Sequence, residues 1–168
     1  LVQEVVEQIK ESTPEYYSLI FDQATTSPAT IQQNLARNQA FMEYFLGDSS
    51  LYTFTITGDT SLFLKYDQPD SIRKWVKNWT ASIKEMDMNF LTPSYKLYTA
   101  LIQPVKKYID LPEKLIIVPD EILNLVNYEA LVTEIPNVDR IYLPDFKDYL
   151  IFDHTISYAF SASTLKES

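Results

Sequence analysis

The segment from residue 51 to residue 57 alternates its side chains with a period of two. One set is Leu51, Thr53, Thr55 and Thr57, and the other is Tyr52, Phe54 and Ile56. Such alternation is typical of a strand with one buried face. Strand-like segments lie on both sides, at residues 40–46 and 62–66, and turn residues at 47–50 and 58–59 separate the three. Because connections this short join antiparallel neighbours, the sequence predicts a three-stranded antiparallel meander.

Two amphipathic helices are predicted after the meander. Apolar residues recur every three or four positions along the first helix, namely Ile72, Trp75, Val76, Trp79, Ile83 and Met86. Asp70 or Ser71 is the expected N-cap. The second helix should begin near Ser94, and its apolar face would comprise Leu97, Leu101, Val105 and Tyr108. We expect Pro104 to kink or break this helix, because proline has no backbone N–H to donate.

A buried strand and several short elements complete the predicted fold. Residues 115–118 are a continuous, mostly β-branched run that ends at Pro119, as is typical of a strand in a parallel sheet. We also expect a short helix that starts at Ser27-Pro28, another at 128–133, an irregular connection at 135–147, and extended segments at 16–21, 149–152 and 155–160. Together these elements predict an α/β fold, in which a mixed sheet contains the antiparallel meander and has flanking helices.

Composition excludes several classes of function. The chain has 168 residues, enough for one domain, with no cysteine, one histidine, two glycines and a net charge of −9. It therefore contains no disulfide, thiolate ligand, cysteine nucleophile, multi-histidine metal site or glycine-rich phosphate loop. The negative charge opposes nucleic-acid binding, and no apolar run approaches the length of a membrane span. We expect no cofactor, no metal, no nucleic-acid or membrane partner, and a cytoplasmic location.

His154 is the single histidine and the first candidate for catalysis. With Asp153 or Asp120 and a serine it could form a Ser-His-Asp site, and the candidate serines are Ser157, Ser161 and Ser163. However, Asp153 and His154 are adjacent, so on a strand they would point to opposite faces. The serines also lack the flanking glycines of a nucleophile elbow. We therefore favour a structural histidine in a loop or at a strand edge.

Two carboxylates, Asp120 and Glu121, follow the predicted parallel strand. The carboxyl ends of such strands are where α/β folds bind ligands, so this pair could bind a cation or serve as acid and base. Acidic residues are also common in turns for local reasons, because they hydrogen-bond to nearby backbone N–H groups. The favoured interpretation is a solvated turn in which Asp120 caps the next segment.

Aromatic and basic residues of the first helix could form an interaction surface. Trp75 and Trp79 lie one turn apart, but their spacing with the apolar stripe favours a place in the core. The basic residues Arg73, Lys74, Lys77 and Lys84 could bind an anion, although a solvated helix face is the simpler interpretation. Twelve tyrosines hint at a protein interface, and they could equally pack the strands.

Three blocks of sequence, in a fixed order, carry a family resemblance. The first block covers residues 41–48 and 51–57. The second covers 97–104, 115–120, 123–124 and 129–131, and the third covers 149–150, 156–159 and 161–163. Together they resemble the N-terminal part of a CHAT domain, the caspase-like, separase-related domain often found after tetratricopeptide repeats in bacteria. The resemblance spans roughly residues 14 to 168, and Asn127 stands where many members have proline.

The resemblance implies a caspase-like cysteine peptidase whose histidine base and cysteine nucleophile lie C-terminal to the block at 161–163. It therefore assigns no catalytic, cofactor-binding or metal-binding residue to this chain. It also implies that residues 1–12 are the end of a preceding helix or a repeat linker, and that 13–168 are the N-terminal, pseudo-caspase part of a CHAT-like domain. The expected partners are proteins, including the rest of its own chain, with repeats before and a catalytic half after.

Two functions follow from these observations. The first is a non-catalytic N-terminal half of a CHAT-type peptidase, which supports or regulates a catalytic half absent from this sequence. The alternative is a degenerate caspase-like scaffold for protein interactions, coupled to tetratricopeptide repeats. A histidine and a cysteine encoded after Ser168, each at the end of an apolar strand, would distinguish the peptidase from the scaffold.

Overall fold

The computed structural model describes residues 27–135 and 144–161. Five strands form one mixed sheet in the order β3-β2-β1-β4-β5. The strands are β1 (Gln39–Leu46), β2 (Leu51–Thr57), β3 (Ser61–Tyr66), β4 (Lys114–Val118) and β5 (Thr155–Tyr158). The α-helices of these ranges are α3 (Pro28–Asn34), α4 (Pro69–Lys84), α5 (Leu91–Leu101), α6 (Gln103–Lys106) and α7 (Leu150–Asp153). Short 3-10 turns are η1 (Met88–Phe90), η2 (Glu121–Leu125), η3 (Tyr128–Ala130) and η4 (Phe146–Asp148).

Strand direction divides the sheet into an antiparallel part and a parallel part. β1 pairs antiparallel with β2, and β2 with β3, so the predicted meander is confirmed. β4 is parallel to β1 on one side and to β5 on the other, which confirms the predicted parallel strand. Parallel neighbours need a long crossover, and α4, α5 and α6 lie within the connection from the meander to β4. The predicted α/β fold with a mixed sheet is therefore confirmed, and it is consistent with a caspase-like fold.

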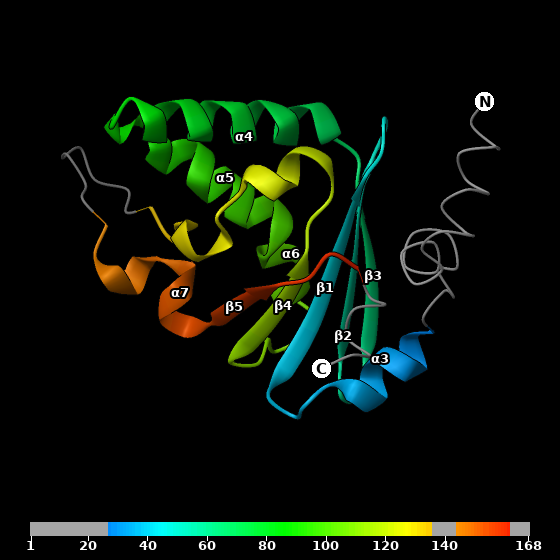
Figure 1. Ribbon diagram of the computed structural model, residues 1–168. Helices are drawn as coiled ribbons and strands as arrows, with labels where there is room; N and C mark the ends of the chain where they lie inside the picture. Colours follow the sequence, from blue (N-terminus) through cyan, green and yellow to red (C-terminus); the bar gives the residue numbers. More distant parts are fainter. Residues whose placement is uncertain (1–26, 136–143, 162–168) are drawn as a thin grey trace, which may run out of the picture.

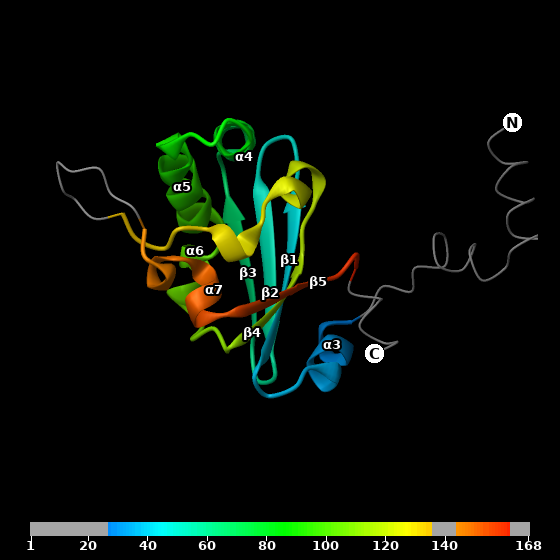
Figure 2. The ribbon, with the colours of Figure 1, turned by 60° about the vertical axis from the view of Figure 1, so that its left-hand side comes forward.

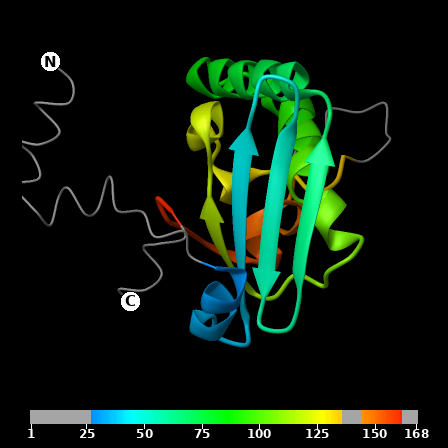
Figure 3. The ribbon, with the colours of Figure 1, turned by 90° about the vertical axis from the view of Figure 1, so that its right-hand side faces the viewer.

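The helices are distributed unequally over the two faces of the sheet (Figure 1). α4, α5, α6 and α7 lie on one face, which we call the covered face, and Figure 2 shows the same layering from a second direction. Of the described helices, α3 alone lies on the other side, which we call the open face. Figure 3 looks onto the open face, where α3, near the start of β1, is the one described helix beside β1, β2 and β3.

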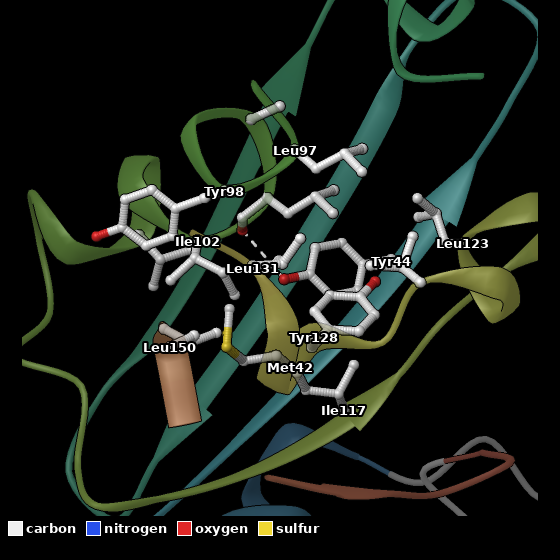
Figure 4. Packing of buried hydrophobic residues seen from close by; sticks show 14 of the residues in the cluster. Met42, Tyr44, Leu97, Tyr98, Ile102, Ile117, Leu123, Tyr128, Leu131 and Leu150 are labelled. Atoms are coloured by element: carbon white, nitrogen blue, oxygen red, sulfur yellow. Dashed lines mark hydrogen bonds between the residues drawn. The ribbon is translucent and has the colours of Figure 1, made fainter. Parts of the chain in front are cut away.

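The larger hydrophobic core lies between the sheet and the helices of the covered face (Figure 4). The fully buried strand residues in it are Ala40, Met42, Leu51, Leu115 and Ile117. The Tyr44 hydroxyl is also buried there and donates a hydrogen bond to the Leu101 carbonyl at 3.0 Å. A much smaller cluster of Ile31, Phe41, Ile56 and Val118 forms under α3. Residues that alternate along β1 and β2 therefore contribute to two hydrophobic cores of unequal size, one on each face of the sheet.

The predicted first helix is present, but both of its predicted ends are wrong. α4 begins at Pro69 with Gln68 as N-cap, not at Asp70 or Ser71, because proline is favoured in the first helical turn and loses no hydrogen bond there. At the other end, Met86 lies beyond the helix, with φ of 52° and a 93 % exposed side chain. The apolar stripe that the helix buries is therefore Ile72, Val76 and Trp79.

The predicted second helix is broken, as expected, and starts earlier than Ser94. α5 covers Leu91–Leu101, and α6 restarts at Gln103. Pro104 explains the break, because its ring would clash with the carbonyl four residues earlier. Tyr108 was predicted to lie on the apolar face of this helix, and that prediction is wrong. It follows α6, and its side chain is 70 % exposed.

Two predictions near the C-terminal end of the described chain are also wrong. The segment at 149–152 was predicted to be extended, but α7 is helical over Leu150–Asp153, because tertiary contacts override the β-propensity of its aromatic residues. Tyr149 keeps an extended backbone and bridges to Val132. That bridge also ends the helix predicted at 128–133, which is reduced to η3.

Some predictions concern residues that the structure does not describe. The expected repeat linker at 1–12, the extended segment at 16–21 and the middle of the irregular connection at 135–147 lie outside the described residues. Among the helices of the described ranges, none has the length and the apolar character needed to cross a membrane.

Candidate functional site at the carboxyl edge of the sheet

The carboxyl ends of β1, β4 and β5 meet at one edge of the sheet, because the three strands run parallel. Ligands of α/β folds bind at such an edge. Two hollows open here, one of about 430 Å³ and one of about 310 Å³. Pro119 and Phe160, which follow β4 and β5, line both of them, so the hollows are neighbours.

The larger hollow contains a tyrosine–carboxylate pair. The Tyr158 hydroxyl donates a hydrogen bond to Glu129 Oε2 at 2.5 Å and accepts one from the Tyr128 backbone N–H at 3.0 Å. Two effects raise the pKa of Tyr158 above its usual value: burial, which is the larger, and the hydrogen bond to Glu129. This phenol therefore stays protonated at neutral pH and acts as a hydrogen-bond donor. The pair joins the end of β5 to η3.

Asp120 joins the ends of two strands instead of capping the next segment. It occupies the N-cap position of η2, but its side chain makes no cap hydrogen bond. Its Oδ2 instead accepts a hydrogen bond from the Leu46 backbone N–H at 2.8 Å. The predicted capping role was therefore wrong. The cause is a tertiary contact: β1 and β4 are adjacent, so the end of β1 lies beside Asp120. A local turn pattern does not indicate such a contact.

Arg73 is part of the edge and not of a solvated helix face. Its Nη2 lies 3.0 Å from Glu121 Oε2 and donates hydrogen bonds to the carbonyls of Leu46 and Gly47 at 3.3 and 3.2 Å. It therefore ties α4 to the β1–β2 turn and to η2, and our prediction for this residue was wrong. Lys74, Lys77 and Lys84 are exposed, as predicted. Asp120 and Glu121 thus have separate partners, so the structure gives no support to a shared cation site.

The smaller hollow opens onto the open face of the sheet. Glu43 and Asp120 are its two carboxylates. The aromatic residues that line it are Tyr44, Phe45, Tyr52, Phe54, Phe63 and Phe160. None of the residues that line it is a lysine or an arginine. No pattern within a single segment indicates this set of residues, although Phe41, Glu43 and Phe45 share one face of a strand by their spacing of two.

His154 has the structural role that the sequence favoured. Its side chain is buried, and Nδ1–H donates a hydrogen bond to the Pro112 carbonyl at 2.9 Å. Nε2 is buried without a hydrogen-bond partner. Burial lowers the pKa of the imidazole, which favours its neutral form. Because neither ring nitrogen bonds to a serine or a carboxylate, the Ser-His-Asp site finds no support in this geometry.

The remaining candidate residues serve the packing of the fold. Ser157 Oγ donates to the Leu115 carbonyl at 3.4 Å, while Ser163 lies outside the described residues. Trp79 is buried, as predicted, whereas Trp75 is only partly buried and carries the Lys96 ammonium 5.8 Å from its ring centre. Within residues 27–135 and 144–161, no three histidine or acidic side chains are grouped so that they could hold a metal ion.

Comparison with known proteins bears on the C-terminal part of the chain. None of the curated proteins matches it. The family model of the CHAT domain matches residues 91–168, a range that contains α5, β4, β5 and the larger hollow. CHAT domains are a caspase-like, peptidase-associated family, which agrees with the α/β architecture. The predicted resemblance to the CHAT domain is therefore confirmed over residues 91–168 of this chain.

Proposed function

We propose that this chain is the non-catalytic N-terminal half of a CHAT-type, caspase-like cysteine peptidase in the cytoplasm. Its role is to support and regulate a catalytic half that carries the histidine and the cysteine. The observation that carries the proposal is the outer edge of β5, which pairs with no strand of residues 27–135 and 144–161 and which we call the open edge. β5 lies inside the region that matches the CHAT domain. An unpaired strand edge is a template for another strand.

The backbone of β5 is suited to continue the sheet. Thr155 N–H and Ala159 N–H donate to the carbonyls of Glu113 and Ile117, on the β4 side. In a strand the N–H groups alternate in direction, so the Ile156 N–H points toward the outer edge. No strand of the described ranges pairs with that edge. A parallel strand from a catalytic half would satisfy these groups and extend the sheet.

The side chains of this half are suited to support and not to catalysis. The chain has no cysteine, and the single imidazole is committed to the Pro112 carbonyl. The Tyr158–Glu129 pair fixes the end of β5 against η3. A strand that is held in this way presents a rigid edge, so a neighbouring strand would dock on it with a small loss of conformational entropy.

The first experiment compares the chain with the full encoded protein. We expect the purified 168-residue chain to cleave no member of a fluorogenic peptide library. We expect the encoded residues after Ser168 to contain a histidine and a cysteine, each after an apolar strand, and the longer protein to lose cleavage on replacement of that cysteine by alanine. Cleavage by the 168-residue chain alone, or an encoded protein with neither residue, would contradict the proposal.

The second candidate function is a degenerate caspase-like scaffold coupled to tetratricopeptide repeats. The smaller hollow on the open face favours it, because an aromatic-lined surface is typical of protein interfaces. Its expected signature is an encoded protein that lacks both catalytic residues and has repeats before Leu1. Finding the histidine and the cysteine would decide for the peptidase half.

A further inference from the structure

The smaller hollow, called the aromatic groove below, has no part in the proposed support of a catalytic half. It lies on the open face at the carboxyl ends of β1 and β4. Its walls come from the antiparallel strands, from Pro119 after β4 and from Phe160 after β5. Its volume of about 310 Å³ is at the lower end of the range for ligand pockets and suits one large side chain.

The floor of the aromatic groove contains a carboxylate without a partner. Glu43 is directly opposite Phe54 on β2 and Val118 on β4, so apolar side chains flank it on both neighbouring strands. No hydrogen bond or ion pair links its carboxylate to another described residue, and burial raises its pKa. A half-buried charge in apolar surroundings is costly until an opposite charge neutralises it.

The walls of the aromatic groove are aromatic rings in mutual contact. Tyr52 stacks on Phe63 with 5.7 Å between the ring centres, and its ring centre lies 6.3 Å from that of Phe45. Phe45 and Phe63 are 61 % and 62 % exposed, so these rings are available to a partner. The face of an aromatic ring attracts a cation within about 6 Å of its centre. Rings and carboxylate therefore favour the same kind of ligand.

The charges around the aromatic groove favour a cation as well. Asp120 is its second carboxylate, and no basic residue lines it. Lys65, the basic residue next to Tyr52 on β3, is paired with Asp67 at 2.7 Å. The whole chain carries a net charge of −9, which attracts basic partners over longer distances.

We propose that the aromatic groove binds a basic side chain, lysine or arginine, from an extended segment of a partner protein. The cation lies against the rings of Tyr52 and Phe63 and pairs with Glu43. The test below distinguishes this partner from two other occupants, namely residues 1–26 of this chain and a second copy of it. Both of these occupants are net negative and so do not complement the carboxylates of the groove. Residues 1–26 contain one basic residue and five acidic ones, and a second copy of the chain is acidic as a whole.

The test is a binding titration with the full 168-residue chain. The probes are fluorescein-labelled five-residue peptides with glycine at every position except the centre, which holds arginine, lysine or the uncharged citrulline. The variants Glu43→Gln and Phe63→Ala remove the charge and one ring. Glu85→Gln and Phe146→Ala are matched controls, because both residues are exposed and do not line the groove. Amide signals in NMR spectra locate the bound peptide, and thermal melts show that each variant is folded.

The proposal expects arginine and lysine peptides to shift the amide signals of 43–45 and 52–54, with citrulline at least about fivefold weaker. Glu43→Gln and Phe63→Ala should each weaken binding by about five- to tenfold, and the two controls should leave it unchanged. Equal binding of citrulline, or no loss in Glu43→Gln, would overturn the proposal. Groove signals that shift on removal of residues 1–26, or a dimer that Phe63→Ala abolishes, would overturn it in favour of the other occupants.

Discussion

The covered and open faces of the sheet use the same strands for different purposes. On the covered face, Met42, Leu115 and Ile117 are fully buried under four helices. On the open face, two positions of the same meander, Phe45 and Phe63, remain more than half exposed. The comparison shows that alternation along a strand decides which side chains share a face, but not whether that face is buried.

The two faces also differ in function: the covered face stabilises the fold, and the open face is suited to binding a partner. Antiparallel strands commonly leave one face to solvent, but a group of exposed aromatic rings on such a face marks a site of interaction. The α3 cluster buries Phe41 and Ile56 and extends to Val118, where the aromatic groove begins. We therefore expect substitutions on the covered face to change the free energy of unfolding, and substitutions on the open face to change binding.

The largest effect should come from truncating the covered-face core. Leu115→Ala removes a fully buried side chain from β4, an interior strand of the sheet, and leaves a cavity. We expect the free energy of unfolding to fall by about 2–5 kcal/mol in urea denaturation followed by circular dichroism. A loss below about 1 kcal/mol would mean that the covered face is not a packed core.

A smaller effect is expected from the hydrogen bond that links this core to α5. Tyr44→Phe removes the hydroxyl that donates to the Leu101 carbonyl and leaves that carbonyl without its partner. The expected loss is about 1–2 kcal/mol in the same denaturation assay. An unchanged midpoint would show that the Tyr44 hydroxyl does not contribute to the stability of the core.

A still smaller effect is expected for an aromatic residue of the open face. Phe63→Ala removes a ring that stacks on Tyr52 at an exposed position of the edge strand β3. The expected loss of stability is below about 1 kcal/mol, the range of a cross-strand pair. If Phe63→Ala destabilised the chain as strongly as Leu115→Ala, the contrast between the two faces would be disproved.

The smallest effect concerns Glu43 and depends on pH. Burial raises the pKa of Glu43 in the folded state above 4.5, so folding favours the protonated carboxyl. This stability is present below the unfolded pKa and is lost as the pH rises through the folded pKa. Glu43→Gln should therefore unfold at higher denaturant than the parent chain at about pH 7, and the gap should close near pH 4. A gap that widened toward acid would contradict this.

The sequence predicted the elements whose patterns are local. The period-two run at 51–57 predicted β2 and its place in the meander, and the apolar run at 115–118 predicted β4. The roles of Asp120 and Arg73 were mispredicted, because their partners are Leu46 and Glu121, which lie 74 and 48 positions away. A pattern within one segment does not indicate which distant group a side chain of that segment will contact.

The aromatic groove shows the same limit. Its residues come from four strands, β1 to β4, and from the segments after β4 and β5, so no single stretch contains it. A usable signal was present in β1, where Glu43 interrupts the face shared by Phe41 and Phe45. An acidic residue in the apolar face of a strand is unexpected unless the face is open or paired. The groove becomes apparent only from the register of β2 against β1, which places Phe54 opposite Glu43.

The open edge of β5 carries the proposed function, and amide hydrogen exchange at Ile156 tests that edge directly. In the 168-residue chain, the Ile156 N–H should exchange much faster than the Ile117 N–H of β4, a strand paired on both sides. In the longer protein with the catalytic half, the proposal predicts that exchange at Ile156 slows to the rate of a paired strand. Equal and rapid exchange at Ile156 in both proteins would contradict the claim that this edge receives the catalytic half.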